Sequence, residues 1–217
     1  MDRNKTKKLQ LLLGTCFEKN KVLLHRVNVN MQMEKSPVFD RNTVEFVTVA
    51  AEYCSFVEKA GECEPERMLD VLSKLLPLLY LKASMLDEVT VQGLYLEESV
   101  SEPEYDALRS RLQAVLREND DYLEVFVEEM KYSDTPVGRC ISEDLADIWQ
   151  ALKNFVNSYR SGLSEVMEEA VAVVTDGFRT YWGQTLANTL RAVHSAKYNP
   201  VGYGDDGSFE REDSIYG

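Results

Sequence analysis

The sequence has few of the residues from which metal and catalytic sites are usually built. It contains two histidines, His25 and His194, and four cysteines without a CxxC pair. A structural metal site needs cysteine or histidine ligands at short, regular spacings, and the chain offers none of these. Unpaired cysteines are typical of a reducing compartment. We therefore expect no metal site, no cofactor and free thiols.

Sequence motifs of nucleophilic and phosphate-binding enzymes are also missing. Neither GxSxG nor the glycine-rich loops GxGxxG and GxxxxGK[ST] occurs. The stretch VGYGDDG at 201–207 lies near the C-terminus, with no strand expected before it and no helix after it. The sequence favours a binding protein over an enzyme, although a helical enzyme with scattered catalytic residues would look the same.

Long apolar runs are absent, and none approaches the ~20 residues that span a bilayer. The start MDRNKTKK followed by LQLLLGTCF has the basic and apolar order of a signal peptide. Its apolar part is short, however, and lysines return after Cys16. We expect a cytoplasmic protein that does not enter a membrane.

Positive charge is scarce, because 24 lysines and arginines stand against 37 acidic residues and give a formal net charge of −13. A nucleic-acid partner requires a basic surface. The basic N-terminal cluster, Arg3, Lys5, Lys7 and Lys8, has no aromatic residues between its members that stack on bases. The sequence thus predicts that the protein does not bind nucleic acid.

Proline and glycine are few as well, with 6 and 11 residues, and no Pro/Gly/Ser-rich linker divides the chain. We predict one helical domain at 39–198. It follows an N-terminal arm or short helix at 1–38. The last residues, 199–217, are rich in glycine and acidic residues, which predicts a disordered acidic tail.

What the sequence does contain is helical periodicity, clearest at 141–160. Ser142 is the expected N-cap, Glu143 and Asp144 put negative charge on the positive end of the helix dipole, and Gly162 follows the end. Apolar residues recur at three- and four-residue steps: Leu145, Ile148, Trp149, Leu152, Phe155, Val156 and Tyr159. This pattern predicts an amphipathic helix at 141–160, and we expect the other helices to pack around it.

Similar signals predict helices that begin at Asp40 or Asn42, at Pro65, at Ser101 and at Ser164, with an interruption at Gly177. The sum is an all-α, single-domain bundle of about six helices.

Two segments of this bundle are harder to assign. The helix after Pro65 is apolar nearly all round between 71 and 81, which predicts a central buried helix that kinks or breaks at Pro77. Residues 120–130 are expected to be irregular or helical, because no second strand is available to pair with them. Residues 133–139 are expected to form a turn.

Four blocks of sequence resemble a bacterial family, the domain of unknown function five-zero-six-three. The blocks are LPLLYLKAS at 76–84, DYLEVF at 121–126, ISEDLADIWQALKNF at 141–155 and FRTYWGQTLANTLRAVH at 178–194. The resemblance covers roughly 41–197. It implies a small, all-helical cytoplasmic protein and brings no established activity, substrate or cofactor.

The polar and aromatic residues inside these blocks are the candidates for a ligand pocket: Tyr122, Asp144, Asp147, Arg179, Trp182 and His194. The carboxylates of Asp144 and Asp147 suit acid–base chemistry or a hard metal ion, or they simply complement the helix dipole. His194 is either a general base or anion contact near Arg191, or a partly buried core residue. Trp182 is most simply a core anchor.

Two functional hypotheses follow. The first is an interaction or regulatory module that binds a protein partner or forms a homo-oligomer. The alternative is a small-ligand-binding protein or enzyme with a pocket between the Pro77 helix and the Trp182 helix, which would use Asp144, Arg179 or His194.

Overall fold

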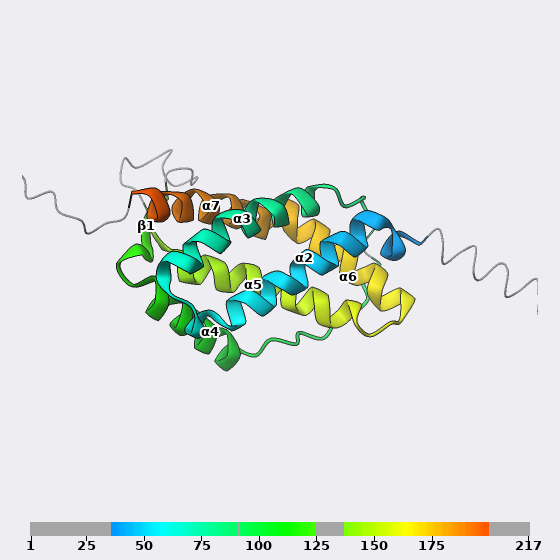
Figure 1. Ribbon diagram of the computed structural model, residues 1–217. Helices are drawn as coiled ribbons and strands as arrows, with labels where there is room; N and C mark the ends of the chain where they lie inside the picture. The colour runs from blue at the N-terminus through cyan, green and yellow to red at the C-terminus, as the bar shows by residue number, and fades with distance from the viewer. Residues whose placement is uncertain (1–35, 91, 125–136, 200–217) are drawn as a thin grey trace, which may run out of the picture.

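The computed structural model describes residues 36–90, 92–124 and 137–199. The predicted acidic tail, apart from its first residue, and most of the predicted N-terminal arm lie outside these ranges. The described chain is built mainly from α2 (Arg41–Glu58), α3 (Pro65–Ser84), α4 (Glu102–Leu116), α5 (Ile141–Tyr159), α6 (Ser164–Gly177) and α7 (Gly183–Tyr198) (Figure 1). Short 3-10 turns are η1 (Pro37–Phe39), η2 (Ala60–Glu62) and η3 (Arg117–Asn119). The predicted all-α fold is confirmed.

Helix α5 lies at the centre of the bundle. It packs against α2, α4, α6 and α7, and the apolar stripe of its sequence is buried, with Leu145, Ile148 and Leu152 fully shielded from solvent. Each such side chain stabilises the fold by about 1.5–3 kcal/mol relative to an exposed one. The periodicity at 141–160 therefore marks the helix that organises the core.

Helix α3 is an outer helix, and the prediction that it would be central and buried is wrong. It packs mainly against α2 and α7. Leu72, Leu76 and Leu79 point into the core, while Leu78 and Leu81 on the other side are 42% and 53% exposed. The helix also continues through Pro77 without a break, because packing of its buried face offsets the one lost backbone hydrogen bond.

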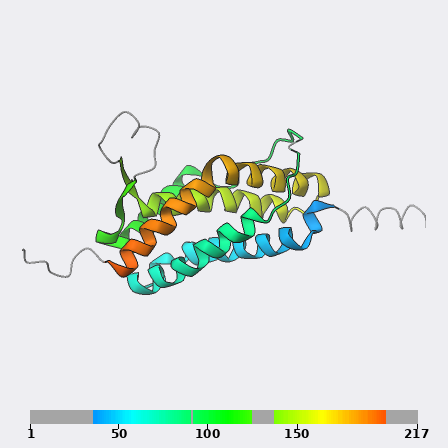
Figure 2. The same cartoon turned by 90° about the horizontal axis from the view of Figure 1, so that it is seen from above.

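A small antiparallel hairpin forms one end of the bundle (Figure 2). Strand β1 (Asp121–Glu124) pairs with β2 (Val137–Cys140), with Asp121 opposite Cys140 and Glu124 opposite Val137. The predictions of irregular or helical structure at β1 and of a turn at β2 are wrong for these residues. The partner strand was missed because its four residues, VGRC, carry no alternating apolar pattern. Residues 125–136 lie outside the described ranges.

The start of α5 depends on the hairpin. The helix begins at Ile141, and Ser142 is not its N-cap as predicted. Asp120, 22 positions earlier, accepts the backbone N–H of Ser142 at 2.7 Å and its hydroxyl at 2.7 Å. A carboxylate brought in by the fold thus satisfies an amide that would otherwise lack a partner. Asp40 does cap α2 as expected, accepting the N–H of Asn42 at 2.8 Å.

The predicted interruption at Gly177 takes the form of a π-helical segment, η5 (Phe178–Trp182), that joins α6 to α7. A Cβ on Gly183 would lie 2.2 Å from the carbonyl oxygen of Phe178, so only glycine fits there. The wider turn directs Trp182 into the core, where 1% of its surface is exposed. Its indole N–H donates to the carbonyl of Val174 at 3.0 Å.

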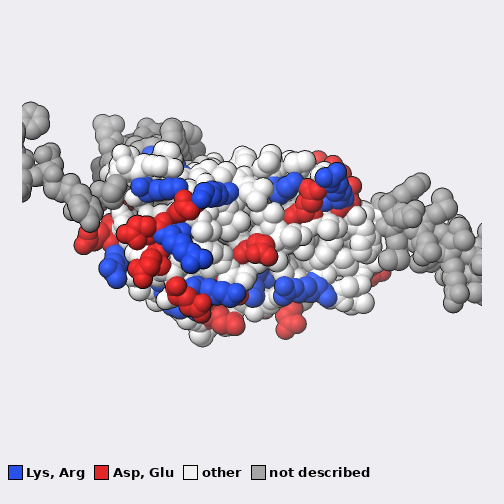
Figure 3. Space-filling model, viewed as in Figure 1, with Lys and Arg blue, Asp and Glu red and all other residues white. Residues whose placement is uncertain are grey.

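The surface shared by α2, α3 and α7 mixes charges of both signs. Figure 3 shows lysines and arginines interspersed with acidic residues over this face. Lys82 of α3 bridges to Glu45 of α2, and Lys197 of α7 lies 2.9 Å from Asp70 of α3. Within the described ranges, every helix is too short or too polar to cross a membrane.

Candidate functional site

Asp144, in the first turn of α5, is the centre of a buried polar network. Arg139 of β2 donates to one carboxylate oxygen at 2.6 Å, and the Tyr122 hydroxyl of β1 donates to the other at 2.5 Å. Thr189 of α7 contributes a longer bond of 3.3 Å. Burial raises the pKa of Asp144, and the bonds from Tyr122 and Arg139 oppose that rise. The network joins the hairpin to two helices.

A second buried carboxylate shares the same arginine. Glu124 accepts a hydrogen bond from the side-chain amide of Asn188, and its other oxygen lies 3.6 Å from Nε of Arg139. Burial and the bond to Asp144 raise the pKa of Tyr122, so this hydroxyl stays a donor at neutral pH. One guanidinium therefore serves two carboxylates, and the donors at Asp144 are already engaged. This arrangement is a structural clamp for the hairpin.

Asp147, one turn further along α5, is held by two phenols. Tyr105 of α4 donates to one carboxylate oxygen at 2.6 Å, and Tyr181 of the π-helical segment donates to the other at 2.6 Å. Partial burial and Asp147 raise the pKa of Tyr181 to about 12. The carboxylate thus connects α4, α5 and the π-helical segment, and it fixes Tyr181 beside a cavity.

This cavity lies between α5 and α6 and has a volume of about 300 Å³. The two helices face it with residues at three- and four-residue steps: Ala151, Asn154, Phe155 and Ser158 from α5, and Ala170, Val173, Val174 and Gly177 from α6. Trp182 and Tyr181 complete the wall. Small side chains, such as Ala151 of α5 and Ala170 of α6, leave space between the two helices.

A nine-residue segment before α4, here named the strap (residues 92–100), crosses the cavity and is anchored at both ends. The buried carboxylate of Glu169 accepts the backbone N–H groups of Gln92 at 2.7 Å and Gly93 at 3.0 Å. At the other end, the side-chain oxygen of Asn154 accepts the N–H groups of Ser99 at 2.9 Å and Val100 at 3.1 Å. The residues between these anchors are thereby held over α5 and α6.

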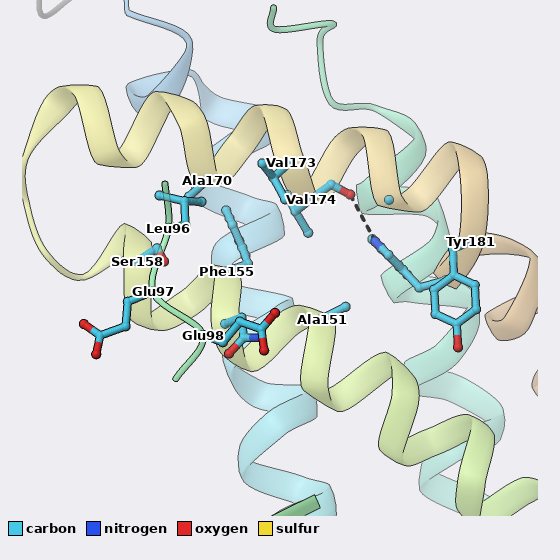
Figure 4. Close-up of a pocket in the computed structure, with 13 residues that line it drawn as sticks. Leu96, Glu97, Glu98, Ala151, Phe155, Ser158, Ala170, Val173, Val174 and Tyr181 are labelled. Atoms are coloured by element: carbon cyan, nitrogen blue, oxygen red, sulfur yellow. Dashed lines mark hydrogen bonds between the residues drawn. The ribbon is translucent and has the colours of Figure 1, made fainter. Parts of the chain in front are cut away.

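Gly93 has a φ of +79°, a conformation that L side chains rarely adopt, and it lets the two amides at the first anchor point at one carboxylate. Three strap residues line the cavity: Leu96, Glu97 and Glu98. Figure 4 shows them in front of the groove between the helices.

The predicted site residues are divided among these features. Tyr122 and Asp144 meet in the buried network, while Asp147 and Trp182 are linked through Tyr181 at the cavity. The cavity lies between α5 and α6 rather than against the Pro77 helix.

Arg179 and His194 lie elsewhere. Arg179 forms an exposed ion pair with Glu88 at 2.7 Å, and the ring of His194 lies 4.7 Å from that of Tyr198. The basic residue that reaches Asp144 is Arg139.

One group of described residues has the composition of a metal site: Asp120, Asp121 and Cys140, whose ligand atoms lie within 4.8 Å of one another. Both oxygens of Asp120 are engaged at the start of α5. The Cys140 thiol donates to Asp121 at 3.4 Å, and burial raises its pKa to about 11. Metals bind the thiolate, which this environment disfavours. We assign these residues to the hairpin contact.

Comparison with known proteins agrees with this architecture. Residues 37–199 match the family described as Domain of unknown function (DUF5063). The chain belongs to this family. It is also similar to protein BF1032 from Bacteroides fragilis, whose crystal structure matches with a TM-score of 0.67 and 43% sequence identity, over 76% of this chain and 97% of that one. No curated protein matches the chain.

Several residues that shape this DUF5063 domain escaped the sequence reasoning. Arg139 fell in a segment predicted to be a turn, and Asn154 has no local signal for anchoring the strap. Glu169 does carry a local signal, because it is an acidic residue on the apolar side of α6, three residues after Val166 and three before Ala172. A carboxylate at such a position is buried only where donors from elsewhere meet it.

Proposed function

We propose that this DUF5063 protein binds a small apolar molecule in the cavity beneath the strap. The observation that carries the proposal is an apolar cavity of about 300 Å³, walled by Phe155, Val174 and Trp182 and crossed by an anchored segment. Small-molecule sites begin at roughly this volume and combine apolar walls with a few polar groups.

The π-helical segment beside the cavity supports the same proposal. Such wide turns occur mostly as local distortions of α-helices and are frequent at functional sites. Here the distortion places Trp182 in the wall and Tyr181 at the rim. Because Tyr181 and Asp147 are hydrogen-bonded to each other, we propose binding rather than catalysis as the role of this site.

Filling the cavity should remove ligand binding. In Ser158→Phe the aromatic ring would occupy the space between α5 and α6, so the affinity for a neutral probe, 4-phenylbutanol, is expected to fall at least about tenfold. Binding is measured by the fluorescence of Trp182, which lines the cavity, in a Trp149→Phe background. Thermal unfolding reports whether each variant is folded.

Ala187→Phe is the matched control, because Ala187 is exposed on α7 and lies outside the cavity wall. It should bind the probe as the parent protein does. Failure of the parent protein to bind 4-phenylbutanol saturably, or equal losses in both phenylalanine variants, would overturn the proposal.

A second candidate function is self-association through the outer face of α3. Leu78, Leu81 and Met85 are 42%, 53% and 41% exposed, and their three- and four-residue spacing places them in one stripe. We propose that a second copy of the chain covers this stripe. Contiguous exposed apolar surface is a common mark of interaction sites.

Charges at the two ends of the stripe favour an antiparallel pair. Lys74, which pairs with Asp70, is exposed before the stripe, and Asp87 and Glu88 are exposed just beyond it, where Glu88 pairs with Arg179. A two-fold axis near Leu81 would bring Lys74 of each copy toward the acidic pair of the other. Opposite charges would then flank an apolar centre.

Leu81→Glu is expected to raise the dissociation constant of the pair at least about tenfold, because it buries a carboxylate at the centre of the stripe. Sedimentation equilibrium measures this constant. Leu163→Glu is the control, since Leu163 is 64% exposed in the turn between α5 and α6. A parent protein that is monomeric at every concentration, or an equal effect of the control, would refute self-association through α3.

A further inference from the structure

The two ends of the cavity differ in chemistry. Figure 4 shows Tyr181 at one end and the carboxylates of Glu97 and Glu98 toward the other, with Ala151, Phe155 and Val174 between them. The cavity is therefore apolar along its length and acidic at one mouth.

The acidic mouth carries the negative charge of two carboxylates. Glu97 and Glu98 are the only charged residues in the described wall, and neither forms an ion pair with any residue in the ranges that the structure describes. Both are exposed, so each carboxylate keeps its hydration. A cation at this mouth would gain attraction from both.

At the opposite end of the cavity, the Tyr181 hydroxyl also favours a ligand that donates hydrogen bonds. The Tyr181 hydroxyl donates its hydrogen bond to Asp147. Its oxygen can therefore still accept a hydrogen bond from a ligand. Carboxylates accept only. An anionic ligand would thus meet two like charges at the strap and no free donor at the Tyr181 hydroxyl, whereas an ammonium group would meet an acceptor at either place.

From this arrangement we propose that the ligand is an organic cation, an amine with an apolar aliphatic or aromatic body. The body lies between α5 and α6 beneath the strap, and the ammonium group lies at the mouth beside Glu97 and Glu98. This inference rests on the small-molecule site proposed above and adds the charge of its ligand. Because the two carboxylates remain hydrated, they supply discrimination between ligands, and the apolar wall supplies most of the affinity.

The test uses three probes that share one body and differ in charge: 4-phenylbutylamine, 4-phenylbutanol and 4-phenylbutyrate. At low salt and neutral pH, the amine is expected to bind about fivefold to tenfold more tightly than the alcohol, and the carboxylate more weakly than either. The preference should shrink in high salt, because exposed charges are screened.

The charge of the mouth is then removed in the double variant Glu97→Gln/Glu98→Gln. Amine and alcohol should bind this variant about equally, with the affinity for the alcohol unchanged. The matched control, Glu102→Gln/Glu165→Gln, removes the same charge from two exposed residues outside the wall and should keep the preference for the amine.

The outcomes separate the two proposals. Equal binding of amine and alcohol to the parent protein overturns the cationic ligand and leaves the apolar site standing. Two other results would place the cation outside this mouth and also overturn the cationic ligand. One is a preference for the amine that survives in Glu97→Gln/Glu98→Gln, and the other is unchanged amine binding in Ser158→Phe. Absence of binding by all three probes overturns the small-molecule site itself.

Discussion

Replacing Arg139 with methionine is expected to lower the free energy of unfolding by about 3 kcal/mol at pH 7. The change leaves Asp144, which is fully buried, and Glu124, which is 7% exposed, without their shared cation. Breaking a buried ion pair by removing one partner costs about 3–5 kcal/mol. The lower end of that range applies because about a third of the Arg139 side chain is exposed. Urea unfolding measures the loss.

Two further variants separate charge from packing. Arg191→Met removes an arginine that contacts the same hairpin through the Leu123 carbonyl at 2.8 Å but is exposed, so it should cost no more than about 1 kcal/mol. Arg139→Met combined with Asp144→Asn should recover at least half of the single loss, because the asparagine is neutral. A double variant no more stable than Arg139→Met would show that the charge of Asp144 is not the cause.

The loss should also depend on pH. The folded state raises the pKa of Asp144 through burial, so it holds this proton more tightly than the unfolded chain does. Above that pKa, Asp144 is charged in the folded state, and burial of this charge lowers the free energy of unfolding. The loss disappears as the pH falls through the raised pKa. Without Arg139 the pKa rises further. The deficit of Arg139→Met relative to the parent protein should therefore be largest at neutral pH and shrink on acidification.

Gly183→Ala is expected to cost about 3 kcal/mol, at the upper end of the usual range for overpacking. The added Cβ would lie 2.2 Å from the carbonyl oxygen of Phe178 and 2.7 Å from its ring. A main-chain oxygen cannot move aside as a flexible side chain can. Relief requires the π-helical segment to rearrange, which would displace Tyr181 and Trp182 from the cavity. Both chemical unfolding and binding of 4-phenylbutanol should show the effect.

Gly61→Ala is the control for this substitution. A Cβ at Gly61 meets nothing within 4 Å, and no positive φ is recorded there, so its stability should change by no more than about 0.5 kcal/mol. If Gly183→Ala unfolds at the same denaturant concentration as the parent protein and still binds the probe, the π-helical segment does not require glycine.

Local sequence signals predicted the helices well where apolar residues repeat along one face of a single helix. The apolar residues of α5, such as Leu145, Ile148 and Leu152, repeat at the helical period and are buried. Helix starts that depend on nearby residues were also predictable, as with Asp40 and Asn42. The family resemblance, drawn from four such blocks, is confirmed over 37–199.

Predictions became wrong where a segment depended on a distant partner. Strand β2 is stable only because β1 lies beside it, and its four residues carry no pattern of their own. Helix α3 is apolar on several sides, yet composition alone does not say which side receives a neighbour. Leu76 lies on the side that is buried, whereas Leu78 lies on the side that stays exposed.

The sequence by itself determined the helical class, the family and the central helix, because helical periodicity and capping are properties of neighbouring residues. Only the tertiary structure decided which polar groups meet. Asp144 is paired with Arg139 rather than with Arg179 or His194, and Glu169 and Asn154 hold a strap over a cavity. Such contacts join residues tens of positions apart, and their geometry exists only once the helices have packed.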